Sequence, residues 1–95
     1  MKWSVIIKKR VLKTLAKIPA SDRNKIMHFL EKELPDMENP RIKGEPLHGD
    51  LNAFWKYRFG NYRLVCEIID KEIAIFVMMA GDRRDVYEFA PKKQK

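Results

Sequence analysis

The sequence predicts an α+β domain with the element order βααβββ: a mainly antiparallel four-stranded sheet with a two-helix hairpin on one face. Three observations lead to this fold class. The spacing of apolar residues changes from strand-like to helix-like after Ile7, prolines and glycines collect in 35–50, and two turn signals divide the remainder into three alternating runs. The 95 residues suit one compact domain, so 1–95 is expected to be a single unit.

The first half should contain one strand and two helices. Trp3–Ile7 is rich in β-branched residues and is the expected first strand. A helical stripe of apolar residues follows it, formed by Val11, Leu12, Leu15 and Ile18. Pro19 ends this helix and Ser21 is the expected N-cap of the next one, whose stripe is Ile26, Met27, Leu30 and Leu34. Because the connection is short, the two helices should pack as an antiparallel hairpin.

An irregular connector and three strands make up the rest of the domain. The connector, 35–50, holds three of the five prolines. The strands are expected at about Ala53–Phe59, Tyr62–Ile69 and Glu72–Ala80, joined by turns at Gly60-Asn61 and Asp70-Lys71. Residues two apart in a strand share a face, so the helical side of the sheet should carry Tyr62, Leu64, Cys66, Ile68, Ile73, Ile75, Val77 and Met79.

The Gly60-Asn61 hairpin should gather cations on the opposite face. With a two-residue turn, Arg58 lies directly opposite Arg63, and Lys56 lies opposite Val65. The two arginines and Lys56 then share one surface. Like charges that face each other across a strand pair are destabilising, so this arrangement indicates an anion that normally offsets them. The alternative is a pair of solvated arginines that splay apart on an exposed sheet face.

Composition favours a polyanionic partner. The chain has 20 Lys+Arg against 13 Asp+Glu, a net charge of +7, which suits nucleic acid or an acidic protein. The single Cys66 excludes an internal disulfide, fits a reducing compartment and is expected to fill space in the core. No apolar run approaches the roughly 18–20 residues of a membrane span, and the N-terminus lacks the apolar core of a signal peptide. We therefore expect a cytoplasmic protein without a membrane partner.

Metal and cofactor chemistry has little support in the sequence. His28 and His48 have no Cys or carboxylate partner at ligand spacing, and there is no glycine-rich phosphate loop. We expect no metal and no small-molecule cofactor. Each histidine is interpreted as a surface or half-buried side chain.

The strand order predicts a cluster of cations suited to a phosphodiester. Three antiparallel strands bring the Gly81 end of the last strand beside Tyr62, so the residues after Gly81 can reach Arg63. A nuclease without metal or histidine must use the 2′-hydroxyl of RNA as its nucleophile. Tyr87 is the best candidate for the proton acceptor, because surrounding cations stabilise the tyrosinate form. The alternative for Tyr87 is a packing residue that anchors the C-terminal segment.

These residues, in this order, resemble the RelE/ParE toxin superfamily of bacterial and archaeal toxin–antitoxin modules. The likeness runs nearly from end to end and implies the small RelE-like α+β fold. It is carried by the first strand, by the helical hairpin and by four motifs: Pro46-Leu47-His48-Gly49, Trp55-Lys56-Tyr57-Arg58, Asn61-Tyr62-Arg63-Leu64-Val65 and Gly81-Asp82-Arg83-Arg84-Asp85-Val86-Tyr87.

Within the superfamily, RelE-type members are ribosome-dependent endoribonucleases that cut mRNA in the A site, whereas ParE-type members poison DNA gyrase and lack the catalytic set. The positions of that set are filled here, so the resemblance implies the nuclease. It implies that Tyr87 is the general base, that Arg83 is the acid or leaving-group stabiliser, and that the phosphate is bound by Lys56, Arg58 and Arg63. A degenerate relative or a plain nucleic-acid-binding module is a third reading.

Two further expectations follow from the resemblance. Arg84 is a second candidate for the arginine after the last strand and joins the RNA-binding set. Asp82 stands where many relatives have histidine or lysine, and its carboxylate would either weaken the field of the cations or orient Arg83. The family also implies a cognate antitoxin as partner, together with the ribosome and mRNA.

Overall fold

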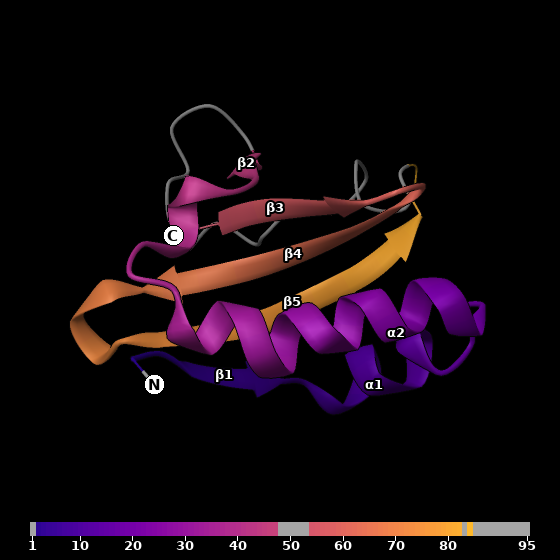
Figure 1. Ribbon diagram of the computed structural model, residues 1–95, viewed down its shortest axis with the longest axis horizontal. Helices are drawn as coiled ribbons and strands as arrows, with labels where there is room; N and C mark the ends of the chain where they lie inside the picture. Colours follow the sequence, from indigo (N-terminus) through magenta and orange to yellow (C-terminus); the bar gives the residue numbers. More distant parts are fainter. Residues whose placement is uncertain (1, 48–53, 83, 85–95) are drawn as a thin grey trace, which may run out of the picture.

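The computed structural model describes residues 2–47, 54–82 and 84 and contains a five-stranded sheet beneath two helices (Figure 1). The strand order is β1-β5-β4-β3-β2. β1 runs parallel to β5, and the other neighbouring pairs are antiparallel. The bounds of the elements are β1 Ser4–Ile7, α1 Lys9–Leu15, α2 Ala20–His28, β2 Glu45–Pro46, β3 Phe54–Phe59, β4 Tyr62–Ile69 and β5 Ala74–Asp82.

The α+β class is correct, but the predicted number of strands is wrong. The fifth strand, β2, lies inside the segment that was expected to be irregular, and it pairs with β3. Two residues are too few to show a period in the sequence. The pairing is held instead by side chains of β3, because the Trp55 indole donates to the carbonyl oxygen of Lys43 at 2.6 Å and the Tyr57 hydroxyl donates to that of Pro40.

The helical hairpin forms, with one correction at its second helix. Ser21 was expected to be the N-cap, but α2 begins at Ala20 and Pro19 occupies the capping position without a side-chain bond. Proline fits there because the residue just before a helix needs no hydrogen bond from its backbone N–H. The residue also has an extended ψ, which proline adopts readily. Beyond His28 the helix continues as a π-helical turn, Phe29–Glu33. In the first helix Leu12 was expected in the buried stripe, yet it is 46% exposed.

The main core lies between the helices and the sheet. Its members come from α1, from the α2 run and from the helical faces of β3, β4 and β5; the fully buried ones include Val11, Leu15, Ile26, Leu30, Leu64, Cys66, Ile75 and Val77. Cys66 is a core residue, as predicted, and burial raises the pKa of its thiol. A thiol that stays protonated in apolar surroundings is a poor nucleophile.

A β-bulge in β5 changes which side chains face the helices. Val65 pairs with Met79 while the next residue of β4, Cys66, pairs with Val77, so Met78 is the extra residue. The extra residue inverts the alternation beyond it. Met79, predicted on the helical side, therefore packs on the opposite face in a second apolar cluster with Leu47, Phe54 and Val65.

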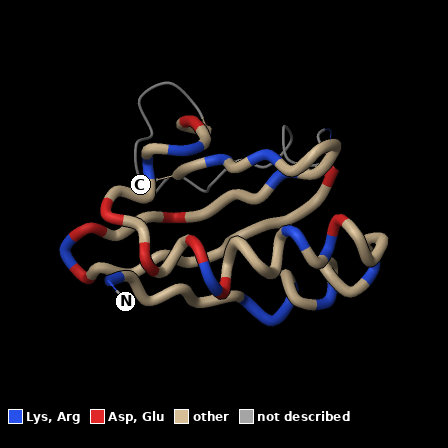
Figure 2. Tube along the Cα trace, in the orientation of Figure 1, with Lys and Arg blue, Asp and Glu red and all other residues tan. Residues whose placement is uncertain are grey.

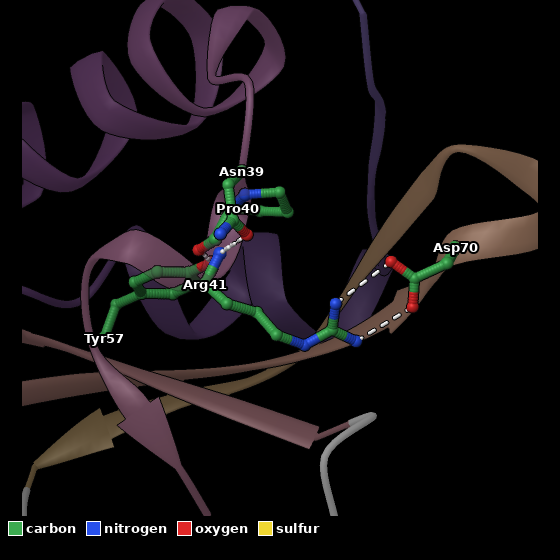
Figure 3. A network of polar contacts seen from close by, with 5 residues as sticks. All are labelled: Asn39, Pro40, Arg41, Tyr57 and Asp70. Atoms are coloured by element: carbon green, nitrogen blue, oxygen red, sulfur yellow. Dashed lines mark hydrogen bonds and ion pairs between the residues drawn. The ribbon is translucent and has the colours of Figure 1, made fainter.

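A polar network ties the connector to the β4–β5 turn (Figure 3). The Arg41 guanidinium donates two bonds of 3.0 Å to the Asp70 carboxylate, and the Asn39 side chain accepts from the Arg41 N–H at 2.9 Å. The bonds from Arg41 hold the pKa of Asp70 below its ordinary value. The connector is thus fixed both to β3, through Trp55 and Tyr57, and to the β4–β5 turn, through Arg41.

Ile73 was expected in a strand on the helical side, and it instead ends the β4–β5 turn in the left-handed region with φ 51°. A β-branched residue is strained there, and 49% of Ile73 is exposed, so little burial offsets the strain.

Ile73→Asn is expected to raise the free energy of unfolding by about 1 kcal/mol, because asparagine tolerates this conformation. Urea denaturation of the variant and of the wild type measures this change in the free energy of unfolding. Ile42→Asn, at an exposed site with negative φ, should change stability little; equal stability of Ile73→Asn and wild type would contradict the prediction.

Candidate functional site

The hairpin between β3 and β4 forms with the predicted register. Gly60 has φ +60°, whereas Asn61 is not among the residues with positive φ, which is the pattern of a type II′ turn. Arg58 pairs with Arg63, and Lys56 pairs with Val65. Glycine at the first turn position is what allows this tight connection, so the turn fixes which side chains face each other.

The three cations of the hairpin share the face opposite the main core, and we call Lys56, Arg58 and Arg63 the cationic face. Tyr57 and Leu64, which alternate with them, are buried beneath the helices. Figure 2 shows Lys and Arg following one another along β3 and the facing part of β4. The sequence-predicted convergence of these residues on one surface therefore agrees with the strand register.

The environments of the three side chains differ. Arg58 is exposed. Arg63 is half-buried, and its Nη1 donates to the carbonyl oxygens of Gly60 at 2.9 Å and Tyr62 at 3.2 Å. These bonds hold the guanidinium at the turn, and both are donated by the same nitrogen atom.

Lys56 is less accessible than a surface cation. Its side chain is 11% exposed, and its Nζ lies 3.3 Å from a carboxylate oxygen of Glu45, its cross-strand neighbour in β2. Sequence reasoning missed Glu45 because it missed the strand that carries it. Any phosphate that reaches Lys56 must compete with this carboxylate.

The end of β5 approaches the same turn. Gly81 pairs with Arg63, and Asp82 pairs with Tyr62, as the predicted strand order requires. The Asp82 carboxylate accepts a bond of 3.0 Å from the backbone N–H of Arg84, which ties Arg84 to the last residue of β5. Arg84 is exposed. The predicted Arg83 and Tyr87, and likewise His48, lie outside the described residues.

Metal-ligand side chains do not gather anywhere in the described ranges: no three of His, Cys, Asp and Glu stand close enough to hold an ion. The Nε2 atom of His28 lies 3.4 Å from a carboxylate oxygen of Glu33. Over the same ranges, none of the helices has the length and apolar character needed to cross a bilayer.

A helical hairpin over a small mixed sheet is also the fold of solved RelE toxins from toxin–antitoxin systems. A family described as the ParE toxin of the type II toxin–antitoxin system parDE matches residues 5–87. The chain belongs to this RelE/ParE family and is a RelE-type toxin.

Relatives and solved structures agree with this assignment. The mRNA interferase toxin RelE of Escherichia coli K12 is 34% identical over 88 residues, which cover 88% of each chain. A mutant of E. coli RelE in the free state is 30% identical, with a TM-score of 0.71 over 92% of both chains. The archaeal RelE–RelB complex of Pyrococcus horikoshii OT3 is 28% identical, with a TM-score of 0.69 over 87% of this chain and 97% of that one.

Proposed function

We propose that the protein is the toxin of a type II toxin–antitoxin module and acts as a ribosome-dependent endoribonuclease that cuts mRNA in the A site. The observation that carries this proposal is the strand register, which sets Arg58 opposite Arg63 with Lys56 two residues away on the same face. The 34% identical relative named as an mRNA interferase supports the same reaction.

The proposed reaction is an attack by the RNA's own 2′-hydroxyl. Its oxygen bonds to the adjacent phosphorus, the bond to the 5′-oxygen breaks, and the products are a 2′,3′-cyclic phosphate and a 5′-hydroxyl. Negative charge on the phosphate oxygens rises in the transition state, and guanidinium and ammonium groups fixed in advance stabilise it. Lys56, Arg58 and Arg63 take this role, and the bonds that Arg63 donates to the carbonyl oxygens of Gly60 and Tyr62 hold its guanidinium in place.

Two proton transfers complete the proposed reaction. Tyr87 is proposed to accept the proton of the 2′-hydroxyl, because cations close to a phenol favour the tyrosinate that this requires. Arg83, with Arg84 as the second candidate, either donates a proton to the departing 5′-oxygen or stabilises its charge until water protonates it, and a 5′-hydroxyl results in both cases. The chemistry needs no metal ion or organic cofactor, because the nucleophile comes from the substrate itself.

The proposed partners are the ribosome with its mRNA and a cognate antitoxin. Solved relatives include RelE–RelB complexes, which supports an antitoxin for this chain. An antitoxin that covers the cationic face would block access of RNA, and the net charge of +7 favours an acidic partner.

The second candidate is a ParE-like inhibitor of DNA gyrase without nuclease chemistry, and the ParE description of the matching family favours it. Primer extension on mRNA in a translating extract distinguishes the two. The nuclease produces cuts that appear only when ribosomes are translating. Intact mRNA together with DNA breaks would support the gyrase inhibitor. If neither mRNA cuts nor DNA breaks are observed, the remaining reading is a nucleic-acid-binding relative without activity.

A further inference from the structure

A groove of about 780 Å³ opens between α2 and β3 beside the cationic face. Lys25 and His28 line its helical wall, and Arg58 lines its sheet wall. It lies where β2, which pairs with β3 at Trp55 and Lys56, has ended, so within the described ranges no strand pairs with the outer edge of β3 beyond Lys56. Aromatic rings also line the groove. The centroid of the Phe29 ring lies 4.9 Å from the centroid of the Tyr57 ring and 5.3 Å from that of the Phe59 ring.

The charges of the groove are unevenly paired. Its two carboxylates already have partners, since Glu33 lies 3.4 Å from His28 and 3.6 Å from Lys43, and Glu45 lies 3.3 Å from Lys56. Lys25 and Arg58 have no ion-pair partner within the part of the chain that the structure describes. Lys25 lines the groove from α2 and Arg58 lines it from β3, so among the described residues the groove presents two cations without an ion-pair partner.

We propose that this groove binds one nucleotide of single-stranded RNA next to the scissile phosphate, with the phosphate of that nucleotide between Lys25 and Arg58. The inference rests on the proposed function, because Arg58 belongs both to the groove and to the cationic face. Two cations that line one groove suit the oxygens of one phosphate. The groove thereby adds a binding residue, Lys25, that the sequence does not single out.

The rest of the groove suits a base. Proteins recognise single-stranded RNA by taking unstacked bases onto aromatic side chains and bonding their edges. Phe59 is half-buried and lines the groove, so part of its ring is available for such contact. Asn24, on the α2 wall, offers an amide with both a donor and an acceptor. An acidic peptide would match the charges but would make no use of this combination of ring and amide.

Binding of a non-cleavable oligonucleotide tests the proposal. The probe is a six-nucleotide 2′-O-methyl RNA, and fluorescence anisotropy gives its Kd over a range of KCl concentrations. Lys25→Ala is expected to weaken binding about tenfold at low salt and to reduce the slope of log Kd against log salt by about 0.7, the loss of one phosphate contact. Lys32→Ala is the matched control, because Lys32 is exposed on the same helical run outside the groove; it should change the Kd less than twofold.

NMR with the same probe locates the binding. Shifts of the Asn24 and Phe59 amides on titration are the expected result. Equal effects of Lys25→Ala and Lys32→Ala, or shifts confined to residues outside the groove, would overturn the proposal. Binding of an acidic decapeptide that depends on Lys25, together with binding of the RNA probe that does not, would also overturn the proposal. That result would assign the groove to a protein partner.

The groove and the nuclease can fail separately. Suppose that the wild type leaves mRNA intact in a translating extract while Lys25→Ala still weakens binding of the probe as expected. The nuclease proposal then fails, and the groove stands as an RNA-binding site. If wild type cuts mRNA but Lys25→Ala binds the probe like wild type, the groove alone fails.

Discussion

Arg63→Ala and Tyr87→Phe are each expected to lower the rate of ribosome-dependent mRNA cleavage by about 10²–10³-fold. Removing Arg63 takes away a preorganised donor to the charged phosphate, and it also leaves the Gly60 carbonyl oxygen without its guanidinium partner. Removing the Tyr87 hydroxyl takes away the proposed proton acceptor. Single-turnover cleavage of mRNA on stalled ribosomes, followed by primer extension, measures both rates.

Two variants sharpen this first prediction. Arg63→Lys should give an intermediate rate, because it keeps the charge and loses the forked geometry of the guanidinium. Lys71→Ala is the control, since this exposed lysine lies in the β4–β5 turn, away from the β3–β4 turn. It should cut at the wild-type rate. Unchanged cleavage by both Arg63→Ala and Tyr87→Phe would remove the assigned site.

Gly44→Ala is expected to destabilise the protein by about 2–4 kcal/mol. Gly44 has φ +78°, and a Cβ atom there would lie 2.3 Å from the carbonyl oxygen of Lys56. That oxygen belongs to the backbone of β3, so the clash cannot be relieved by rotating a side chain. Urea denaturation with a fixed m-value measures the loss.

Gly60→Ala is the matched control for this second prediction. Its φ of +60° is positive as well, but the nearest atom to a new Cβ is Asp22 Oδ1 at 4.0 Å. Gly60→Ala should therefore cost only about 1 kcal/mol. If the two variants lose equal stability, the close approach of the Gly44 segment to β3 is not present in solution. Because the clash displaces Lys56, Gly44→Ala should also impair cleavage in whatever fraction remains folded.

The β3–β4 hairpin could be predicted because local chemistry determines it. A Gly-Asn pair between alternating runs permits few turns, and the turn then sets the register of Arg58 against Arg63. The order of the last three strands follows from the same logic, which is why Gly81 was expected beside the β3–β4 turn. The cationic face could therefore be predicted from the sequence.

Other features depend on contacts between distant segments and leave no local signal. The strand β2 exists because Trp55 and Tyr57 bond the connector, and its Glu45 partner for Lys56 is invisible without it. The bulge at Met78 reverses the alternation of β5, although the apolar run MMA looks continuous. The left-handed Ile73 contradicts its own β preference, so tertiary structure overrides propensity there.

The most direct test of the account removes one oxygen atom from the substrate. An mRNA that carries a single 2′-deoxynucleotide on the 5′ side of the cut, placed in the A site of a stalled ribosome, should survive the toxin at that position. The all-ribose message should be cut there and should end in a 2′,3′-cyclic phosphate. Cleavage of both messages at equal rates would show that the nucleophile is not the RNA hydroxyl, and the mechanism assigned to these cations would be wrong.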